Sequence, residues 1–148
     1  MLKLGNVSID RIYDVMGGYA HISNVCDFIG YKCPCIFYAE VKSIKGNTFP
    51  LKNLTQYDKL ISKKGILGVI SGVVIWYYEH DKVIFCPIET VEEMLLEGKK
   101  SIHIQKDLYR LIDIPSKKKR VFMDSDYSVI FKEYLDKHRE EIIREITK

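Results

Sequence analysis

Short runs of β-branched and aromatic residues, separated by polar turns, fill most of the chain up to residue 120. This pattern is typical of strands. The four residues Lys32-Cys33-Pro34-Cys35 suit a tight connection, so the runs on either side of them are predicted to form an antiparallel hairpin. A second strand pair is predicted around Glu79-His80-Asp81. The expected strands are residues 8–15, 24–31, 36–44, 68–78 and 82–87.

Apolar residues at helical spacing predict a helix that begins near Asn53, which can cap it, and ends at Gly65. On this helix Gln56, Lys59 and Lys63 share a face away from the buried stripe. A short helix is expected over residues 91–97, and another is expected to begin near Ile104. The buried stripe of the first helix comprises Leu54, Tyr57, Leu60 and Ile61.

The last helix has the clearest pattern, because Asp124, Ser125 or Asp126 can cap it and an apolar stripe follows to the end of the chain. Packing of this helix against a partner subunit and packing within the chain are both open. The hydrophobic residues 73–78 offer a second candidate surface for a partner. The apolar stripe comprises Ile130, Phe131, Tyr134, Leu135, Ile142, Ile143 and Ile146.

These elements predict one α/β domain over residues 1–148, with a mixed, largely antiparallel central sheet flanked by helices and a C-terminal helix over residues 127–148. No run of about 18 apolar residues is present, and the start of the chain lacks the pattern of a secretory signal. We therefore expect no membrane partner and a cytoplasmic location. The cysteines have no metal-binding spacing, so we expect reduced thiols at Cys26, Cys33, Cys35 and Cys86.

The net charge of +3 says little about partners, but the charges are unevenly distributed. Residues 42–64 carry six lysines against Asp58 alone, and residues 99–120 are also strongly basic, with only Asp107 and Asp113 opposing. Two such zones are what a phosphate-binding face leaves in a sequence. On charge alone, a pair of solvated surfaces is the favoured interpretation.

If the predicted hairpin turns about Cys33-Pro34, Asp27 lies directly opposite Glu40. Like charges opposite one another on a sheet face repel, and a divalent cation that takes oxygen ligands from both would remove the conflict. Lys42 follows two residues after Glu40, on the same face of the strand. Its ammonium group could hold a water nucleophile or stabilise a developing phosphorane charge.

An acidic residue followed by Glu-x-Lys on the next strand resembles the PD-(D/E)xK nuclease superfamily. Several short motifs in order, over residues 10–127, resemble more narrowly the RecU-type Holliday junction resolvases, in particular their phage-type branch. These motifs are Gly17-Gly18-Tyr19, Asn24-Val25-Cys26-Asp27-Phe28-Ile29, Tyr38-Ala39-Glu40-Val41-Lys42-Ser43, Gly46-Asn47-Thr48 with Pro50, Gln56, and Gly98-Lys99-Lys100-Ser101-Ile102.

The resemblance implies a restriction-endonuclease-like fold and a homodimeric endonuclease, dependent on Mg²⁺ with Mn²⁺ as an alternative, that cuts four-way DNA junctions in a bacterial or phage-infected cytoplasm. It implies that Asp27 and Glu40 ligate the metal, that Lys42 stabilises the transition state, and that Gln56 completes or supports the metal site. Two other functions stay open: a nuclease for other branched or duplex DNA, and a recombination protein that binds branched DNA without cutting it.

The basic zones and the basic-serine motif supply the candidate DNA contacts. For residues 117–120 a phosphate-binding loop and a solvated turn are both open. The candidate contacts are Lys45, Lys52, Lys59, Lys63, Lys99, Lys100, Ser101, Lys117, Lys118 and Arg120.

The chain departs from the family's pattern at two places. Val25 stands where relatives in the longer branch carry a threonine, so only its backbone carbonyl could be a ligand. The family usually opens with a helix that bears a glutamate, whereas here a short segment precedes residues 10–14. Either that helix is absent, or its role passes to Asp10 or Asp14.

Overall fold

In the computed structural model, which describes residues 8–12, 26–119 and 123–148, a six-stranded mixed sheet forms the centre of the molecule. Strands β3 and β5 pair in parallel, and every other neighbouring pair in this sheet is antiparallel. The predicted mixed, largely antiparallel sheet is therefore confirmed. Its strands, in spatial order, are β1 (Ser8–Arg11), β2 (Phe28–Lys32), β3 (Cys35–Ile44), β5 (Val69–Tyr77), β6 (Lys82–Pro87) and β8 (Ile112–Ile114).

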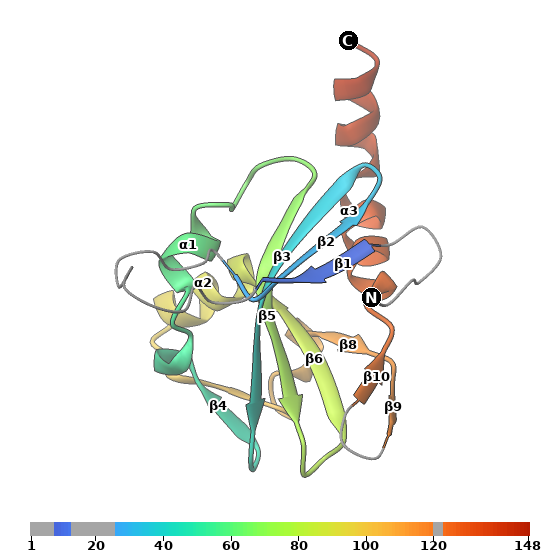
Figure 1. The fold of residues 1–148 in the computed structure, drawn as a ribbon. Coiled ribbons are helices and arrows are strands. Elements are labelled where there is room, and N and C mark those ends of the chain that lie inside the picture. Colours follow the sequence, from blue (N-terminus) through green and yellow to red (C-terminus); the bar gives the residue numbers. More distant parts are fainter. Residues whose placement is uncertain (1–7, 13–25, 120–122) are drawn as a thin grey trace, which may run out of the picture.

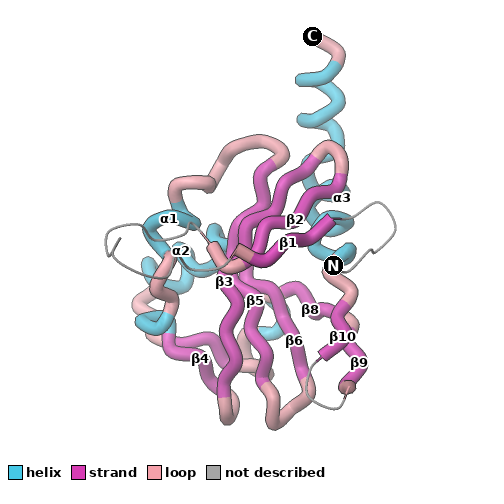
Figure 2. The backbone as a smooth tube through the Cα atoms, viewed as in Figure 1, coloured by secondary structure: helices cyan, strands magenta, loops and turns pink. Residues whose placement is uncertain are grey.

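Helices and two small sheets cover the central sheet on both faces. Figures 1 and 2 show α1, α2 and β4 on one side, and α3 with β9 and β10 on the other. Strand β4 pairs with β7, and β9 pairs with β10. These covering elements are β4 (Thr48–Pro50), α1 (Tyr57–Ile61), α2 (Ile88–Leu96), β7 (Ser101–His103), β9 (Ser116–Lys118), β10 (Met123–Ser125) and α3 (Ser128–Ile146), with 3₁₀ turns at Leu51–Asn53 and Leu108–Arg110.

Side chains that point alternately to the two faces of β5 contribute to two hydrophobic cores. Val73, Ile75 and Tyr77 pack with the layer of α1 and α2, whereas Ile70 and Val74 pack with α3. Because side chains of a strand alternate between faces, a central strand covered on both sides is apolar almost throughout. Strand β5 is therefore interior, and the prediction that residues 73–78 offer a partner surface is wrong for all of them except the exposed Tyr78 and the half-buried Trp76.

The predicted helix over residues 53–65 is wrong in its extent. Asn53 lies in a 3₁₀ turn and caps no helix, and α1 covers only Tyr57–Ile61. The backbone N–H groups of Thr55 and Gln56, which the Asn53 side chain would have capped at an earlier helix start, instead donate to Glu40. A contact with a distant strand therefore decides where this helix begins.

Other predicted boundaries also differ. The helix expected near Ile104 is replaced by a turn and the Leu108–Arg110 3₁₀ segment, and β2 begins at Phe28 rather than at residue 24. Strand β1 ends at Arg11, and the expected strand residues 13–15 and 24–25 lie outside the described residues. Residues 88–96 form α2, three residues earlier at its start than expected. Among the three expected capping residues of α3, Asp126 accepts hydrogen bonds from the N–H and hydroxyl of Ser128.

The last helix has buried contacts with the core beneath it as far as Ile142, and its end projects away from the sheet (Figure 1). Ile130 and Phe131 are fully buried, whereas Ile143 and Ile146 are 52% and 70% exposed. The predicted apolar stripe is therefore covered in part, and its end lies open to solvent. Within the described residues, no helix is both long and apolar enough to cross a lipid bilayer.

Substitution of Phe131 by alanine tests this docking. The ring lies edge-to-face against Phe37, with centroids 5.9 Å apart, at the centre of the core beneath α3. We expect Phe131→Ala to lower the free energy of unfolding by about 3–5 kcal/mol, since both transfer and cavity terms are lost. Ile146→Ala on the same helix is the control, with a change within about 0.5 kcal/mol. Equal effects in denaturant titrations would contradict this packing.

Candidate functional site

The β2–β3 hairpin has the register that the sequence predicts. Phe28 pairs with Ala39, and Lys32 pairs with Cys35 across the turn. The regular ladder ends at Phe28, where the N–H of Asp27 donates to the carbonyl of Ala39 at 2.9 Å. Strand β3 continues past this point along β5 but without β2. Asp27 therefore lies at the place where β2 ends beside β3.

The carboxylate of Asp27 takes over a backbone hydrogen bond of β3. Its Oδ2 atom accepts the N–H of Val41 at 2.8 Å, in the position where a longer β2 would have supplied a carbonyl. Bonds from backbone N–H groups to carboxylates are among the stronger protein hydrogen bonds. Asp27 is thus held next to Glu40, which precedes Val41 on β3.

Glu40 is buried, with 1% of its surface exposed, on the face of β3 that α1 covers. Its Oε1 atom accepts the hydroxyl of Thr55 at 2.8 Å and the N–H of the same residue at 3.2 Å. Oε2 accepts the N–H of Gln56 at 3.1 Å, and the ammonium of Lys42 lies 3.0 Å from Oε1. A buried carboxylate is tolerated when it is paired and hydrogen-bonded, and these donors meet that condition.

These contacts weaken the argument that repulsion between Asp27 and Glu40 requires a metal ion. Asp27 and Glu40 lie on neighbouring strands as predicted, but each negative charge already has donors from the protein. Across the described ranges, no group of three or more His, Cys, Asp or Glu side chains is placed to hold a metal ion. The donor set still fits Mg²⁺, which is commonly bound through one or two carboxylates together with water and substrate phosphate oxygens.

Lys42 and Gln56 both lie at Glu40, as expected. Lys42 extends from the same face of β3, and 31% of its side chain is exposed, so its ammonium is accessible from solvent. Gln56 is half-buried, and its backbone N–H contacts Glu40. Thr55 is the residue of this site that sequence reasoning missed. No local signal pointed to it, because its role is a bond to Glu40, 15 residues earlier in the chain.

Lys63 lies near the candidate site from the turn after α1. Its ammonium is 5.2 Å from the centre of the Tyr38 ring, on the face of β3 that also carries Glu40. Burial raises the pKa of the neighbouring Cys26 thiol; Asp27 adds to this rise and Lys63 opposes it. Lys63 and Asp27 therefore both lie within electrostatic range of Cys26.

Three further candidate lysines line a hollow of about 710 Å³ next to this site. Lys52, Lys99 and Lys100 share the hollow with Thr55, the residue that holds Glu40. Lys99 forms an ion pair with the buried Asp107. Ser101 is half-buried on the neighbouring strand β7. Lys52 and Lys100 are therefore the exposed cations beside the carboxylates.

The remaining candidates are more dispersed. Lys45 is exposed in the loop after β3, and Lys59 is half-buried on α1. Lys117 and Lys118 lie on β9, on the side of the sheet away from α1 (Figure 1), where Lys118 pairs with Asp81 at 3.3 Å. Arg120 lies outside the described residues.

Of the two acidic residues considered as substitutes for a missing glutamate, Asp10 is exposed on the edge strand β1, where it pairs with Ile29. It is therefore two strands away from β3. Asp14, Val25 and the Gly17-Gly18-Tyr19 motif lie outside the described residues.

A second buried carboxylate, Asp107, anchors the turn after β7. It accepts hydrogen bonds from the ammonium of Lys99 and from the N–H of His103, the latter at 2.7 Å. Burial by itself raises the pKa of Asp107. The two hydrogen bonds and the charges of Lys99 and Arg110 outweigh burial, so the pKa of Asp107 lies below its ordinary value of 3.8.

This arrangement predicts a pH dependence of stability. Because the pKa of Asp107 is lower in the folded than in the unfolded chain, its stabilisation is complete above pH of about 4 and is lost as pH falls through the folded-state pKa. We expect Asp107→Asn to lower the free energy of unfolding at neutral pH and to lose less stability on acidification. Denaturant titrations between neutral and acidic pH measure this, and parallel curves for the two proteins would contradict it.

The comparisons with known proteins assign no function to this chain. No protein-family model matches the chain, and no curated protein matches it. One similar solved structure is Hjc, a Holliday junction resolvase from the archaeal hyperthermophile Archaeoglobus fulgidus. It is 17% identical, with 70% of this chain and 78% of that chain covered and a TM-score of 0.48. At that score the likeness carries no functional inference.

Proposed function

We propose that this chain is a Mg²⁺-dependent endonuclease of branched DNA that resolves four-way junctions as a homodimer. The observation that supports the chemistry is that the Asp27 carboxylate binds the N–H of Val41, the residue between Glu40 and Lys42, whose side chains form an ion pair. Two adjacent carboxylates and an ammonium group are the side chains that metal-assisted phosphodiester hydrolysis requires. The ordered motifs that resemble RecU-type resolvases support the choice of substrate.

In this proposal Asp27 and Glu40 hold the metal ion, with Gln56 beside it. A bound Mg²⁺ would make a water molecule more acidic and offset negative charge on the phosphate. The Val41 N–H orients Asp27, and Thr55 with the Gln56 N–H orients Glu40, so neither carboxylate needs to reorganise when substrate arrives. Lys42 moves its ammonium from Glu40 toward the phosphate and stabilises charge there.

The basic residues on the same side supply the DNA-binding surface. Lys52, Lys59, Lys63, Lys99, Lys100 and Ser101 lie on elements that flank the carboxylates, and Lys45 lies at the tip of the β3–β4 loop. Lys117, Lys118 and Arg120 would contact DNA only where it reaches the other side of the sheet. In a symmetric dimer, such a contact comes from a second arm of the same junction.

A second function, binding of branched DNA without cleavage, is favoured by one observation. The contacts of Glu40 in the protein already balance its buried charge, as expected of a carboxylate with a structural role.

One experiment distinguishes the two functions: incubation of the protein with Mg²⁺ and either a synthetic four-way junction or linear duplex. Paired cleavage of the junction supports the resolvase, and tight binding without any product supports the second function. Cleavage of linear duplex at the same rate would instead indicate a less selective nuclease.

Loss of one carboxylate should separate cleavage from binding. The amide oxygen introduced by Asp27→Asn can still accept the Val41 N–H, so the fold is kept while a metal ligand and a negative charge are lost. We expect cleavage to fall more than about 100-fold, whereas junction affinity stays equal or rises, because repulsion of phosphate is reduced. Glu40→Gln should act in the same direction.

The matched control for this prediction is Glu133→Gln, which removes one exposed negative charge from the part of α3 that packs against the sheet, on the side away from α1 (Figure 1). It should leave cleavage within about twofold of the parent, as expected for surface substitutions. Cleavage by Asp27→Asn within tenfold of the parent would overturn the metal-site assignment.

The proposed dimer places its interface on the open end of α3. Ile143 and Ile146 are exposed there, beyond the part of the helix that the sheet covers. We expect sedimentation at micromolar concentration to give a dimer, and Ile143→Ser with Ile146→Ser to shift it toward monomer. Leu96→Ser on α2 is the control, since Leu96 is equally open but lies on a different surface. A monomer both alone and on junction DNA would contradict paired cleavage.

A further inference from the structure

The outer face of the β4–β7 pair carries a hollow of about 350 Å³ that the candidate catalytic site does not use. Thr48 from β4 and His103 from β7 lie directly opposite one another and both line it. Ser101 lies two residues before His103, on the same face of β7, and Lys100, Lys106 and the ion-paired Lys99 and Asp107 also line the hollow. Thr48, Ser101, His103, Lys100 and Lys106 all carry hydrogen-bond donors.

Alternation along the two strands gives this face its polarity. Phe49 of β4 and Ile102 of β7 form the opposite face and are buried in the core that α1 and α2 share. Because neighbouring residues of a strand point to opposite sides, Thr48, Ser101 and His103 face outward together. The core packing of Phe49 and Ile102 therefore fixes the position of the polar face.

His103 is held in one tautomer by the turn that follows it. Its Nδ1 atom accepts the backbone N–H groups of Gln105 at 3.1 Å and Lys106 at 3.2 Å. An imidazole nitrogen that accepts hydrogen bonds carries no proton, so the proton of the neutral ring lies on Nε2. His103 therefore offers a donor, not an acceptor, to a ligand in the hollow.

The charges of the hollow also favour an anion. Lys99 is neutralised by its ion pair with the buried Asp107, which leaves the positive charges of the exposed Lys100 and Lys106. Hydroxyl groups, an imidazole N–H and two ammonium groups together match the several acceptor oxygens of a phosphate.

The hollow adjoins the larger one beside the candidate site. Lys99 and Lys100 line both this hollow and the larger one that contains Thr55, and Thr55 donates to Glu40. A ligand that fills both hollows would need phosphate groups repeated along one chain, as in a DNA strand. We propose that the β4–β7 face binds the phosphate backbone of a DNA arm away from the scissile bond, through Thr48, His103 and Lys106. This inference rests on the proposed function, because it takes DNA as the ligand.

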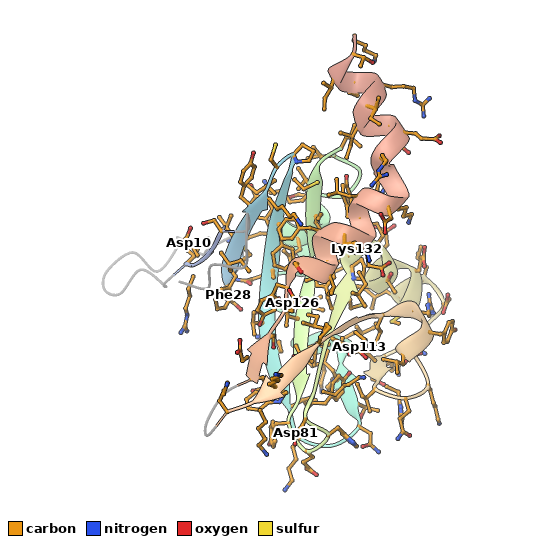
Figure 3. All side chains as sticks on the ribbon, turned by 90° about the vertical axis from the view of Figure 1, so that its right-hand side faces the viewer. Asp10, Phe28, Asp81, Asp113, Asp126 and Lys132 are labelled. Carbon is orange, nitrogen blue, oxygen red and sulfur yellow. The ribbon has the colours of Figure 1, made fainter. Side chains whose placement is uncertain are left out.

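The test compares DNA affinity in two charge-matched variants. The first joins Lys106→Glu to His103→Asn, whose amide oxygen can still accept the N–H groups of the turn while the ring donor is lost. The second is Lys132→Glu with no other change, at an exposed position on α3 on the far side of the sheet (Figure 3). Affinity for a synthetic four-way junction is measured without divalent cations over a series of salt concentrations.

We expect the first variant to bind the junction at least about tenfold more weakly than Lys132→Glu does, because hydrogen bonds to charged groups are lost. Its log–log salt slope should fall by about 0.9, the contribution of one neutralised phosphate. Thr48→Val, which keeps the strand and removes one hydroxyl, should weaken binding about threefold and controls for damage to the turn. The proposal would be overturned if the Lys106→Glu/His103→Asn variant and Thr48→Val both bound the junction with the affinity and salt slope of Lys132→Glu.

Cleavage and affinity separate this inference from the proposed function. If the unaltered protein cuts no DNA but the Lys106 and Thr48 variants lose affinity, the catalytic proposal fails and the phosphate site stands. If the protein cuts junctions and these variants bind like Lys132→Glu, the function stands and the phosphate site fails. Stepwise shortening of the junction arms should abolish the loss of affinity, because the contact lies away from the branch. A loss that persists on the shortest arms would place the contact elsewhere.

Discussion

The hydrogen-bonded burial of Glu40 is the interaction on which the rest of the site depends. A carboxylate removed from water is strongly destabilising unless donors replace its hydration. Thr55 and Gln56 supply three of those donors from the segment just before α1, and Lys42 supplies the fourth. The same bonds hold α1 against β3, and a bond from the Ser71 hydroxyl to the carbonyl of Leu60 holds it against β5. The buried charge of Glu40 thus aligns α1, β3 and a lysine, and the Ser71 bond adds β5.

The sequence was sufficient to predict the β2–β3 register and therefore the proximity of Asp27, Glu40 and Lys42, because a short turn and strict alternation leave few other pairings. It was insufficient for the start of α1. Local propensity favoured a start near Asn53, but the N–H groups of Thr55 and Gln56 are bonded to the side chain of Glu40, 15 and 16 residues earlier in the chain. For the same reason, the role of Thr55 depends on a contact between distant segments that no local pattern encodes.

The second basic zone shows a different limit of sequence reasoning. The basic residues between 99 and 120 form one group in the sequence. The chain passes through the edge strand β8 within this zone, so the group is divided between the two faces of the sheet. Lys100 and Lys106 therefore lie on the side of α1 and α2, and Lys117 and Lys118 lie on the side of α3 (Figure 2). Net charge along the chain is accordingly a poor guide to a binding face unless the topology is known. The register of β4 with β7 adds Thr48 and His103, which no charge count includes.

The bond between Asp27 and the Val41 N–H also constrains the length of the chain between them. Exposed turns usually tolerate insertions, and the turn of the β2–β3 hairpin is exposed at Cys33 and Pro34. One extra residue there would shift β2 along β3 and turn its side chains to the opposite face. Asp27 would then point away from Val41 and Glu40, although every residue of the site would still be present. The turn, which carries no functional side chain, thus acts as a spacer whose length the chemistry fixes.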